Sequence, residues 1–209
     1  MHGRLRHEEG QAQIVPDREA GTATVERSCL SSRPHRMLRE LRQHIDLESG
    51  VIVQEAYWLD GELHRLPSEG PAYVTRHVRE GTVTVTRQEY YLLGKRHREQ
   101  GPAQIIRDRE TGTITVEGYW LNGRRHRNSV DGPALVIRDA VTRIAVHERY
   151  LEDGKFHRDP SYGAAVIERD GETGAVRREE YWHHGEKIAS PERGADRLSR
   201  PRIDGGPTL

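Results

Sequence analysis

The sequence is short of the residues that build a hydrophobic core. Of its 209 residues 33% are hydrophobic, and they include only one Phe and two Met. Ordinary globular domains are roughly 45–50% apolar, so this chain is either disordered or a thin fold with little interior. Disordered chains typically have low sequence complexity or a large net charge. Here 33 Lys and Arg balance 33 Asp and Glu. The composition therefore favours a thin, repeated β-sheet.

The chain has one cysteine, Cys29, and no excess of basic residues. A single cysteine excludes an intrachain disulfide and favours a reducing compartment. Non-specific binding to nucleic acid depends on basic residues that neutralise phosphates and release counterions. Because the charges balance, we expect no nucleic-acid partner.

Long apolar runs are also missing. No run approaches the ~18 residues that suggest a membrane span, and residues 1–13 lack the apolar core of a signal peptide. The sequence therefore predicts a soluble, cytoplasmic protein.

What the chain does contain is an internal repeat. A Gly-(Pro)-Ala motif begins at Gly70, Gly101, Gly132 and Gly163, 31 residues apart each time. A second glycine recurs at about the same period, and a His-Arg pair follows it by three residues in four copies. Self-similarity at a fixed period of this length is the signature of a repeat architecture.

We assign residues 1–189 to an array of about six such units. Residues 10–36 form an eroded copy, and residues 37–49 are the most degenerate part. Within that part, 37–45 (MLRELRQHI) is compatible with a short helix. Residues 190–209 break the pattern and are predicted to be a disordered tail.

One unit, residues 101–127, shows the expected local structure. Residues 103–107 and 113–120 are rich in β-branched and aromatic residues, as strands are. Gly112 would supply the positive φ of the turn between them, and Asn122-Gly123 predicts a second tight turn. The predicted fold class is all-β: a single-layer antiparallel sheet of stacked hairpins.

Alternation along the strands predicts two faces. If the loop at 109–112 closes the hairpin, one face is apolar and the other is mixed. The first would hold Ala103, Ile105, Ile114, Val116 and Trp120, and the second Gln104, Ile106, Thr113, Thr115, Glu117 and Tyr119.

Two aromatic columns run through the array. Adjacent residues of a strand point to opposite faces, so one column should pack while the other is displayed. The apolar alternation places the Trp column inside, and with it Cys29 as a buried thiol. Tyr offers a large contact area at low entropic cost, so the Tyr column is the predicted interface: Tyr57, Tyr90, Tyr119, Tyr150 and Tyr181.

The His-Arg column allows more than one interpretation. Zinc binds donors at about 2.0–2.3 Å, which imidazoles about 10 Å apart on alternate strands cannot share, so we expect no metal. A structural ladder against the next unit's aromatic residue is favoured over a ligand-binding ridge. His183 and His184 should point to opposite faces. The candidate binding residues of the ridge are His64, Arg65, His97, Arg98, His126, Arg127, His157 and Arg158.

Acidic residues recur once per unit, which argues against a catalytic pair, since catalytic sites are singular. Cross-strand charge pairing is the favoured interpretation of this column: Glu26, Glu55, Gln88, Glu117, Glu148 and Glu179. The aspartates that open Asp-x-x-x-Gly segments are interpreted as turn residues and not as calcium ligands. No nucleotide-binding or hydrolase motif is present, so we predict neither enzyme activity nor a cofactor.

The segments 117–134, 89–103 and 180–187 resemble MORN repeats and the related repeats of YwqK-type bacterial antitoxins. The shared skeleton is an aromatic residue, then Gly, then His three residues on, then Gly. The chain departs from it through its 31-residue period and through the Arg that follows His. The resemblance implies a single-layer sheet with a role in protein contact or membrane-associated scaffolding, and an immunity or antitoxin function beside a bacterial toxin.

Together these patterns predict a non-catalytic protein-binding scaffold, with an immunity protein that occludes a toxin as its concrete form. A lipid or polyanion reader that uses the His-Arg ridge is one alternative. Self-assembly through open sheet edges is another. Specificity is expected where the repeat departs from itself, at 37–49 and at the doubly apolar unit 132–151.

Overall fold

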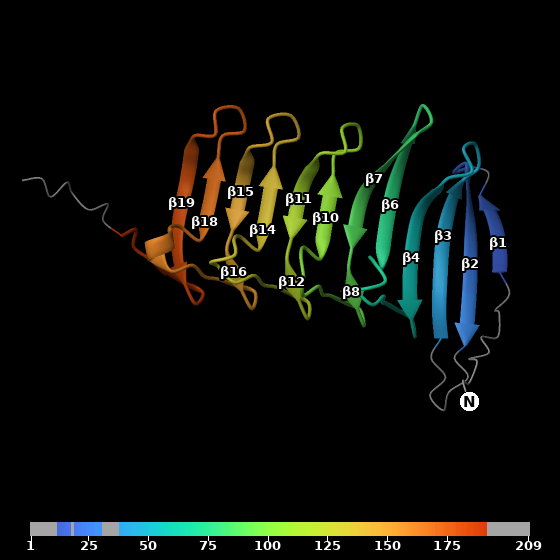
Figure 1. Cartoon of the computed structure of the whole chain (residues 1–209), viewed down its shortest axis with the longest axis horizontal. Coiled ribbons are helices and arrows are strands. Elements are labelled where there is room, and N and C mark those ends of the chain that lie inside the picture. The colour runs from blue at the N-terminus through green and yellow to red at the C-terminus, as the bar shows by residue number, and fades with distance from the viewer. Residues whose placement is uncertain (1–11, 18, 31–37, 192–209) are drawn as a thin grey trace, which may run out of the picture.

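The protein is one long, open antiparallel sheet, seen in a computed structural model that describes residues 12–17, 19–30 and 38–191 (Figure 1). Thirteen strands follow one another across the sheet in chain order, and a short strand pairs beside the fourth. The predicted all-β, single-layer antiparallel sheet is confirmed. Residues 192–209, most of the predicted disordered tail, lie outside the described residues, as do His7 and His35.

From β7 to β18, pairs of longer strands alternate with short hairpins whose two strands have two residues each. The strands are β1 (Ala12–Asp17), β2 (Thr22–Leu30), β3 (Leu38–Asp46), β4 (Ile52–Leu59), β5 (Glu62–Leu63), β6 (Tyr73–Arg79), β7 (Thr82–Glu89), β8 (Tyr91–Leu92), β9 (Lys95–Arg96), β10 (Gln104–Arg107), β11 (Ile114–Gly118), β12 (Trp120–Leu121), β13 (Arg124–Arg125), β14 (Leu135–Arg138), β15 (Ala145–Arg149), β16 (Leu151–Glu152), β17 (Lys155–Phe156), β18 (Val166–Arg169), β19 (Val176–His183) and β20 (Glu186–Ile188). A single 3₁₀ turn, η1 (Pro160–Tyr162), precedes β18.

At one end of the sheet, aspartate loops join the long strands. Asp108 accepts hydrogen bonds from the backbone N–H groups of Glu110 and Thr111 at 3.1 and 2.8 Å, and Gly112 closes the turn with φ 71°. These hydrogen bonds lower the pKa of the Asp108 carboxyl. The predicted turn role of the aspartates is thus confirmed here, and the same loop recurs at Asp46, Asp139 and Asp170.

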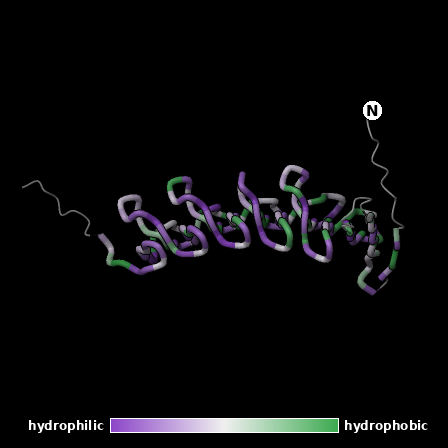
Figure 2. Tube along the Cα trace, turned by 90° about the horizontal axis from the view of Figure 1, so that it is seen from below, coloured by the Kyte–Doolittle hydropathy of each residue, from purple (hydrophilic) through white to green (hydrophobic). Residues whose placement is uncertain are grey.

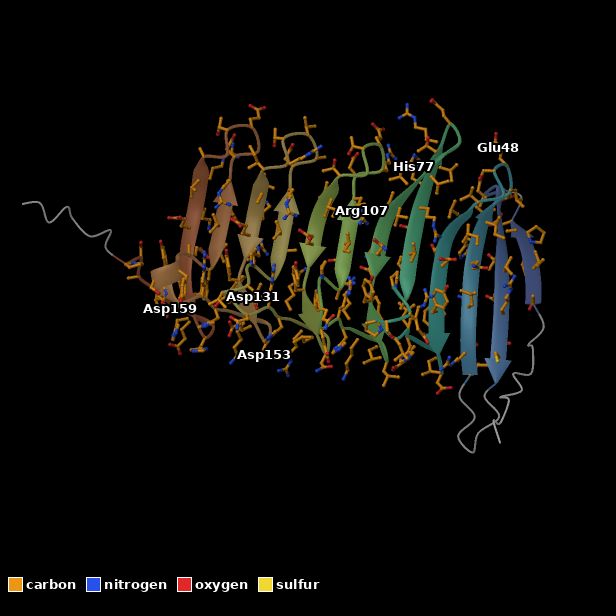
Figure 3. The ribbon with its side chains drawn as sticks, viewed as in Figure 1. Glu48, His77, Arg107, Asp131, Asp153 and Asp159 are labelled. Atoms are coloured by element: carbon orange, nitrogen blue, oxygen red, sulfur yellow. The ribbon has the colours of Figure 1, made fainter. Side chains whose placement is uncertain are left out.

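The opposite end of the sheet carries the short hairpins, β8–β9, β12–β13 and β16–β17 (Figure 1). The predicted turn at Asn122-Gly123 is present, with φ 49° and 81°, the left-handed pair that suits a two-residue hairpin. Three units therefore contribute four strands and not the two that alternation suggested, because the long strands β7, β11 and β15 each end just before a tyrosine. In Figure 3, Glu48 marks the loop end of the sheet, and Asp153 and Asp159 mark the hairpin end.

The predicted division into faces is wrong in one respect. Ile106 lies opposite Val116, and Ile105 lies opposite Glu117, so Ile105 and Ile106 exchange faces. The cause is a β-bulge between Ile106 and Arg107, since one extra residue reverses the side of everything beyond it. We call the side with Ile105, Glu117 and Tyr119 the tyrosine face, and the side with Ile106, Val116 and Trp120 the tryptophan face.

The short helix expected over 37–45 is also wrong. Leu38–Asp46 is strand β3, paired over its whole length with β2 and over most of it with β4. Helix propensity is a weak prior, and two flanking strands offer most backbone groups of this segment a partner. Residue 37 lies outside the described residues.

The interior is as thin as the composition predicts. A column of alanines, Ala72, Ala103, Ala134 and Ala165, is fully buried, whereas no large side chain is completely covered in the described part of the chain. Seen from the hairpin end in Figure 2, the array is a narrow band in which polar residues predominate. Side chains lying over each face, and not a second layer, must therefore provide most of the burial.

Candidate functional site

Arginine–tyrosine stacks cover the tyrosine face at the hairpin end. The guanidinium carbon of each ridge arginine lies 3.9–4.0 Å from the centre of the tyrosine ring eight residues earlier. Each arginine also donates from Nη1 to a carbonyl oxygen in its own loop. The pairs are Arg65 on Tyr57, Arg98 on Tyr90, Arg127 on Tyr119 and Arg158 on Tyr150, and the acceptors are Pro71, Pro102, Pro133 and Ala164.

The ridge histidines tie successive units together. His97 accepts a hydrogen bond through Nδ1 from the backbone N–H of Asn122, at 3.2 Å, in the turn of the following hairpin. His64, His126 and His157 accept in the same way from Leu93, Asp153 and His184. The acceptor role requires the neutral ring with its proton on Nε2. The histidine column thus joins successive units, but the predicted packing on the next unit's aromatic residue is wrong, because each arginine stacks on the tyrosine of its own unit.

The expected contrast between a displayed Tyr column and a packed Trp column is wrong. Tyr90 and Tyr150 are buried, at 7% and 6% exposure, and burial raises the pKa of the Tyr150 phenol. The other column tyrosines are half-buried, as are Trp58, Trp120 and Trp182. An arginine covers the rings of Tyr57, Tyr90, Tyr119 and Tyr150, and alternation along a strand cannot reveal such a contact.

The acidic column joins neighbouring strands, as predicted. Glu55 pairs with Arg76 at 2.9 Å and Glu117 with Arg138 at 2.6 Å, each across to the next strand of the sheet. Glu26 with Arg42 and Glu148 with Arg169 repeat the pairing, and Gln88 accepts from Arg107 in the place of a carboxylate. The 21-residue separation of three of these pairs was a sequence signal that the prediction did not use.

A pocket lies at the hairpin end of β2, β3 and β4. Its volume is about 580 Å³, and its wall includes three predicted binding residues, Tyr57, His64 and Arg65. We call it the N-terminal pocket. The remaining lining residues are Ala12, Arg27, Ser28, Cys29, Arg39, Glu40, Leu41, Trp58, Leu59, Leu66 and Glu69.

The pocket exists because β2, β3 and β4 stay paired to their ends. β3 pairs with β4 as far as Arg39 opposite Leu59, whereas β11 ends at Gly118, before its tyrosine. The paired ends of β2, β3 and β4 form the floor of the pocket, beside the loop that carries Leu66. Cys29 lies half-buried in that floor, so the fully buried thiol expected from the Trp column is wrong. The degenerate copy, singled out in the sequence for its irregularity, thus forms one wall.

One histidine cluster contradicts the sequence-based prediction. The donor atoms of His157, His183 and His184 lie within 4.8 Å of one another, although His183 and His184 were expected to point apart. His184 has φ 49° and lies in the turn after β19, so strand alternation ends at His183. The His157 and His184 rings stack at 4.2 Å, and Nδ1 of His157 already accepts an N–H. A shared zinc ion with bonds of about 2.0–2.1 Å would require these rings to turn.

Comparison with known proteins adds no relative. No family model, characterised protein or solved structure matches the chain. The resemblance to MORN and YwqK-type repeats therefore stays a prediction. In the part of the chain that the structure describes, no helix has the length and apolar character to cross a bilayer.

Proposed function

We propose that this chain is a non-catalytic protein-binding scaffold and that the N-terminal pocket is its principal contact. The observation that carries the proposal is the composition of the pocket wall, which gathers Tyr57, Trp58, Arg65 and Leu66 in one place. Tyr, Trp and Arg are the residues most enriched at the energetic centres of protein interfaces. Leu66 is 44% exposed and would lose that exposure against a partner.

The neighbouring sheet edge supports a protein partner over a small molecule. Ala12 both lines the pocket and begins β1, the first strand of the sheet. β1 is exposed along its length, with Ile14 and Val15 at 66% and 50% exposure. An unpaired strand edge offers backbone groups to an extended segment of another chain. A partner strand laid along β1 would deliver its side chains to the pocket.

The His-Arg ridge enters this proposal as part of the wall. At the pocket, Arg65 lies 3.9 Å from the Tyr57 ring centre and donates to Pro71, and Nδ1 of His64 accepts from Leu93. These internal bonds preorganise the aromatic surface and leave fewer donors for a polyanion. They favour a protein partner over the lipid or polyanion reader, which predicts binding that weakens steeply with salt. An immunity protein that occludes a toxin remains the concrete form that the sequence resemblance implies.

The test is affinity capture of the partner from the source organism, followed by calorimetry with the purified partner and single variants. Leu66→Asp places a charge at the mouth of the pocket and should weaken binding at least tenfold. Val130→Asp is the matched control, since Val130 is 63% exposed in the equivalent loop two units on and lies away from the pocket. Equal affinities for the two variants would refute the pocket as the contact.

Self-association through β1 is a second candidate, because the same exposed edge fits a second copy of the chain. Sedimentation at increasing concentration tests it. Val15→Lys should keep the protein monomeric, since a lysine on an edge strand opposes strand pairing. A wild-type protein that stays monomeric at every concentration would exclude this candidate without touching the first.

A further inference from the structure

On the tryptophan face, a carboxylate neutralises the cations of two units. Glu180 accepts hydrogen bonds from Arg178 at 2.5 Å, Lys187 at 2.8 Å and Trp182 Nε1 at 3.1 Å. These bonds lower the pKa of Glu180 to about 2. Two cations and one indole N–H thus surround a single carboxylate, two residues before the tryptophan that donates to it.

The same position holds a glutamate in β7. Glu89 is only 3% exposed and accepts from Arg96 at 2.7 Å and from Gln104 at 2.8 Å. Tyr91, the aromatic residue two positions later, donates its hydroxyl to Glu89 at 3.4 Å. A carboxylate that accepts from the following aromatic residue is therefore a repeated device of this face.

The two units between them lack this carboxylate: the equivalent residue is Gly118 in the first and Arg149 in the second. An added Cβ on Gly118 would lie 3.1 Å from Trp120 Nε1 and 3.3 Å from Gln104 Oε1. The indole N–H of Trp120 is buried and has no hydrogen-bond partner. An unpaired buried donor is destabilising, so the indole N–H of Trp120 lacks the kind of acceptor that Trp182 has in Glu180.

The cations at this place are present without an anion. Arg125, at the position of Lys187, lies 4.7 Å from the Trp120 ring centre, and Arg149 on β15 holds the position of Glu180 in the next unit. Within the described residues neither side chain forms an ion pair, and Arg125 Nη1 and Arg149 Nε are buried without an acceptor. Burial and the like charges of Arg96 and Arg149 lower the pKa of Arg125, which indicates uncompensated positive charge.

We propose that Arg125, Arg149 and Trp120 Nε1 form a binding site for a carboxylate, which takes the place that Glu180 fills in its own unit. The expected source of the carboxylate is an acidic side chain of the protein partner, and in this respect the inference rests on the proposed function. A free small carboxylate is the other source of the same chemistry. Glu180 likewise accepts from two cations and an indole N–H, there Arg178, Lys187 and Trp182. Charge-assisted hydrogen bonds of this kind are the strong ones.

The experiment follows the indole N–H resonances of the full-length, ¹⁵N-labelled chain, which has three tryptophans. Glutarate is added at constant ionic strength, with uncharged glutaramide as the matched control. The Trp120 resonance should shift and saturate with glutarate in the millimolar range and stay still with glutaramide. Trp182, already bonded to Glu180, should not move.

Trp58 is an internal control for an unpaired indole without cations. Its Nε1 is also buried and unpartnered, the residue two positions earlier is Ala56, and its hairpin carries Leu63 where Arg125 stands. It should not respond to glutarate. A response of Trp58 equal to that of Trp120 would overturn the role of the two arginines.

Gly118→Glu supplies the carboxylate from within the chain, as Glu89 and Glu180 do. In this variant the Trp120 resonance should start near its saturated position and no longer respond, while Gly118→Ala should keep the response. Unchanged Trp58 and Trp182 resonances verify that both variants fold. A Trp120 resonance that ignores glutarate in the wild type, or that still responds in Gly118→Glu, would overturn the proposal.

A tetraglutamate peptide distinguishes the two possible sources of the carboxylate. Tighter binding of the peptide than of glutarate supports an acidic protein segment, and equal binding supports a small carboxylate. Because these probes replace the partner, the result is independent of the N-terminal pocket. Failure of the proposed function would appear as unchanged partner affinity in Leu66→Asp. Failure of the carboxylate site would appear only as a Trp120 resonance that does not respond to glutarate.

Discussion

The guanidinium carbon of Arg127 lies 4.0 Å from the centre of the Tyr119 ring, and its Nη1 donates to the carbonyl oxygen of Pro133 at 3.3 Å. One side chain therefore covers the ring of its own unit and also holds the loop that leads into the next strand. In a sheet with no second layer, this double role replaces part of the missing core.

Replacing Arg127 tests how much the stack contributes. Arg127→Ala should lower the free energy of unfolding by about 1–2 kcal/mol, the sum of a cation–π contact and a hydrogen bond, as measured by urea denaturation. Arg124→Ala is the control, because Arg124 is exposed and stacks on no ring that the structure describes; it should change stability by less than about 0.5 kcal/mol. Equal effects of the two substitutions would contradict the role of the stack.

The inter-unit bond of the histidine ladder is tested at His126, whose Nδ1 accepts from the N–H of Asp153 at 3.1 Å. His126→Leu removes the acceptor and should cost about 1 kcal/mol. His126→Asn places an amide oxygen close to the position of Nδ1 and should restore most of that loss. If both variants unfold at the same urea concentration, the hydrogen bond contributes nothing.

Acid should weaken the C-terminal end of the array through His157. Burial lowers its pKa, with help from His183 and His184 and against the charges of Glu152 and Asp159. The unfolded chain keeps the ordinary value of about 6.5, so below that pH it takes up the proton more readily than the folded chain does. Stability is therefore complete above about pH 6.5 and falls as the pH drops towards 5.

Thermal unfolding at pH 7.5 and pH 5.0 measures this effect. The wild type should lose more stability between the two pH values than His157→Asn, which cannot take up the proton. An identical pH dependence in both proteins would show that His157 does not carry the effect.

Gly132 should resist substitution for reasons of backbone and of space. Its φ is 123°, which L side chains rarely adopt, and an added Cβ would lie 3.0 Å from Nη1 of Arg127. Gly132→Ala should destabilise the protein by about 1–3 kcal/mol. Gly171→Ala is the control, since an added Cβ there meets Val146 at an ordinary 3.5 Å. Equal unfolding midpoints for the two variants would contradict the strain at Gly132.

Much of the architecture could be predicted because it depends on contacts between residues close together in the sequence. The Asn122-Gly123 turn and the Asp108 loop depend on residues that touch one another along the chain, so sequence spacing alone identifies them. The 31-residue period likewise predicted a stacked antiparallel sheet, and even Gly70 and Gly132 could be aligned by inspection. The acidic column was predicted to pair across strands because carboxylates recurred at one position.

The errors lie where residues meet across strands. The bulge beside Ile106 reversed one face of a unit. Pairing with β2 and β4 makes Leu38–Asp46 a strand where a helix was expected over 37–45. His184 joined His157 and His183 only because a left-handed turn ended the alternation. The pocket beside Tyr57 also depends on how far neighbouring strands remain paired. The extent of that pairing cannot be inferred from the sequence of one strand alone.

The sequence by itself determined the repeat, its strand-and-turn chemistry and the thinness of the fold, because each follows from composition or from short-range contacts. Only the tertiary structure decided which side chains are covered and which donors are left without partners. Arg127 covers Tyr119 through a loop contact, and Trp120 faces a glycine where the units around Glu89 and Glu180 place a carboxylate. Burial and hydrogen-bond satisfaction are properties of three-dimensional neighbours, and these neighbours come from different units of the array.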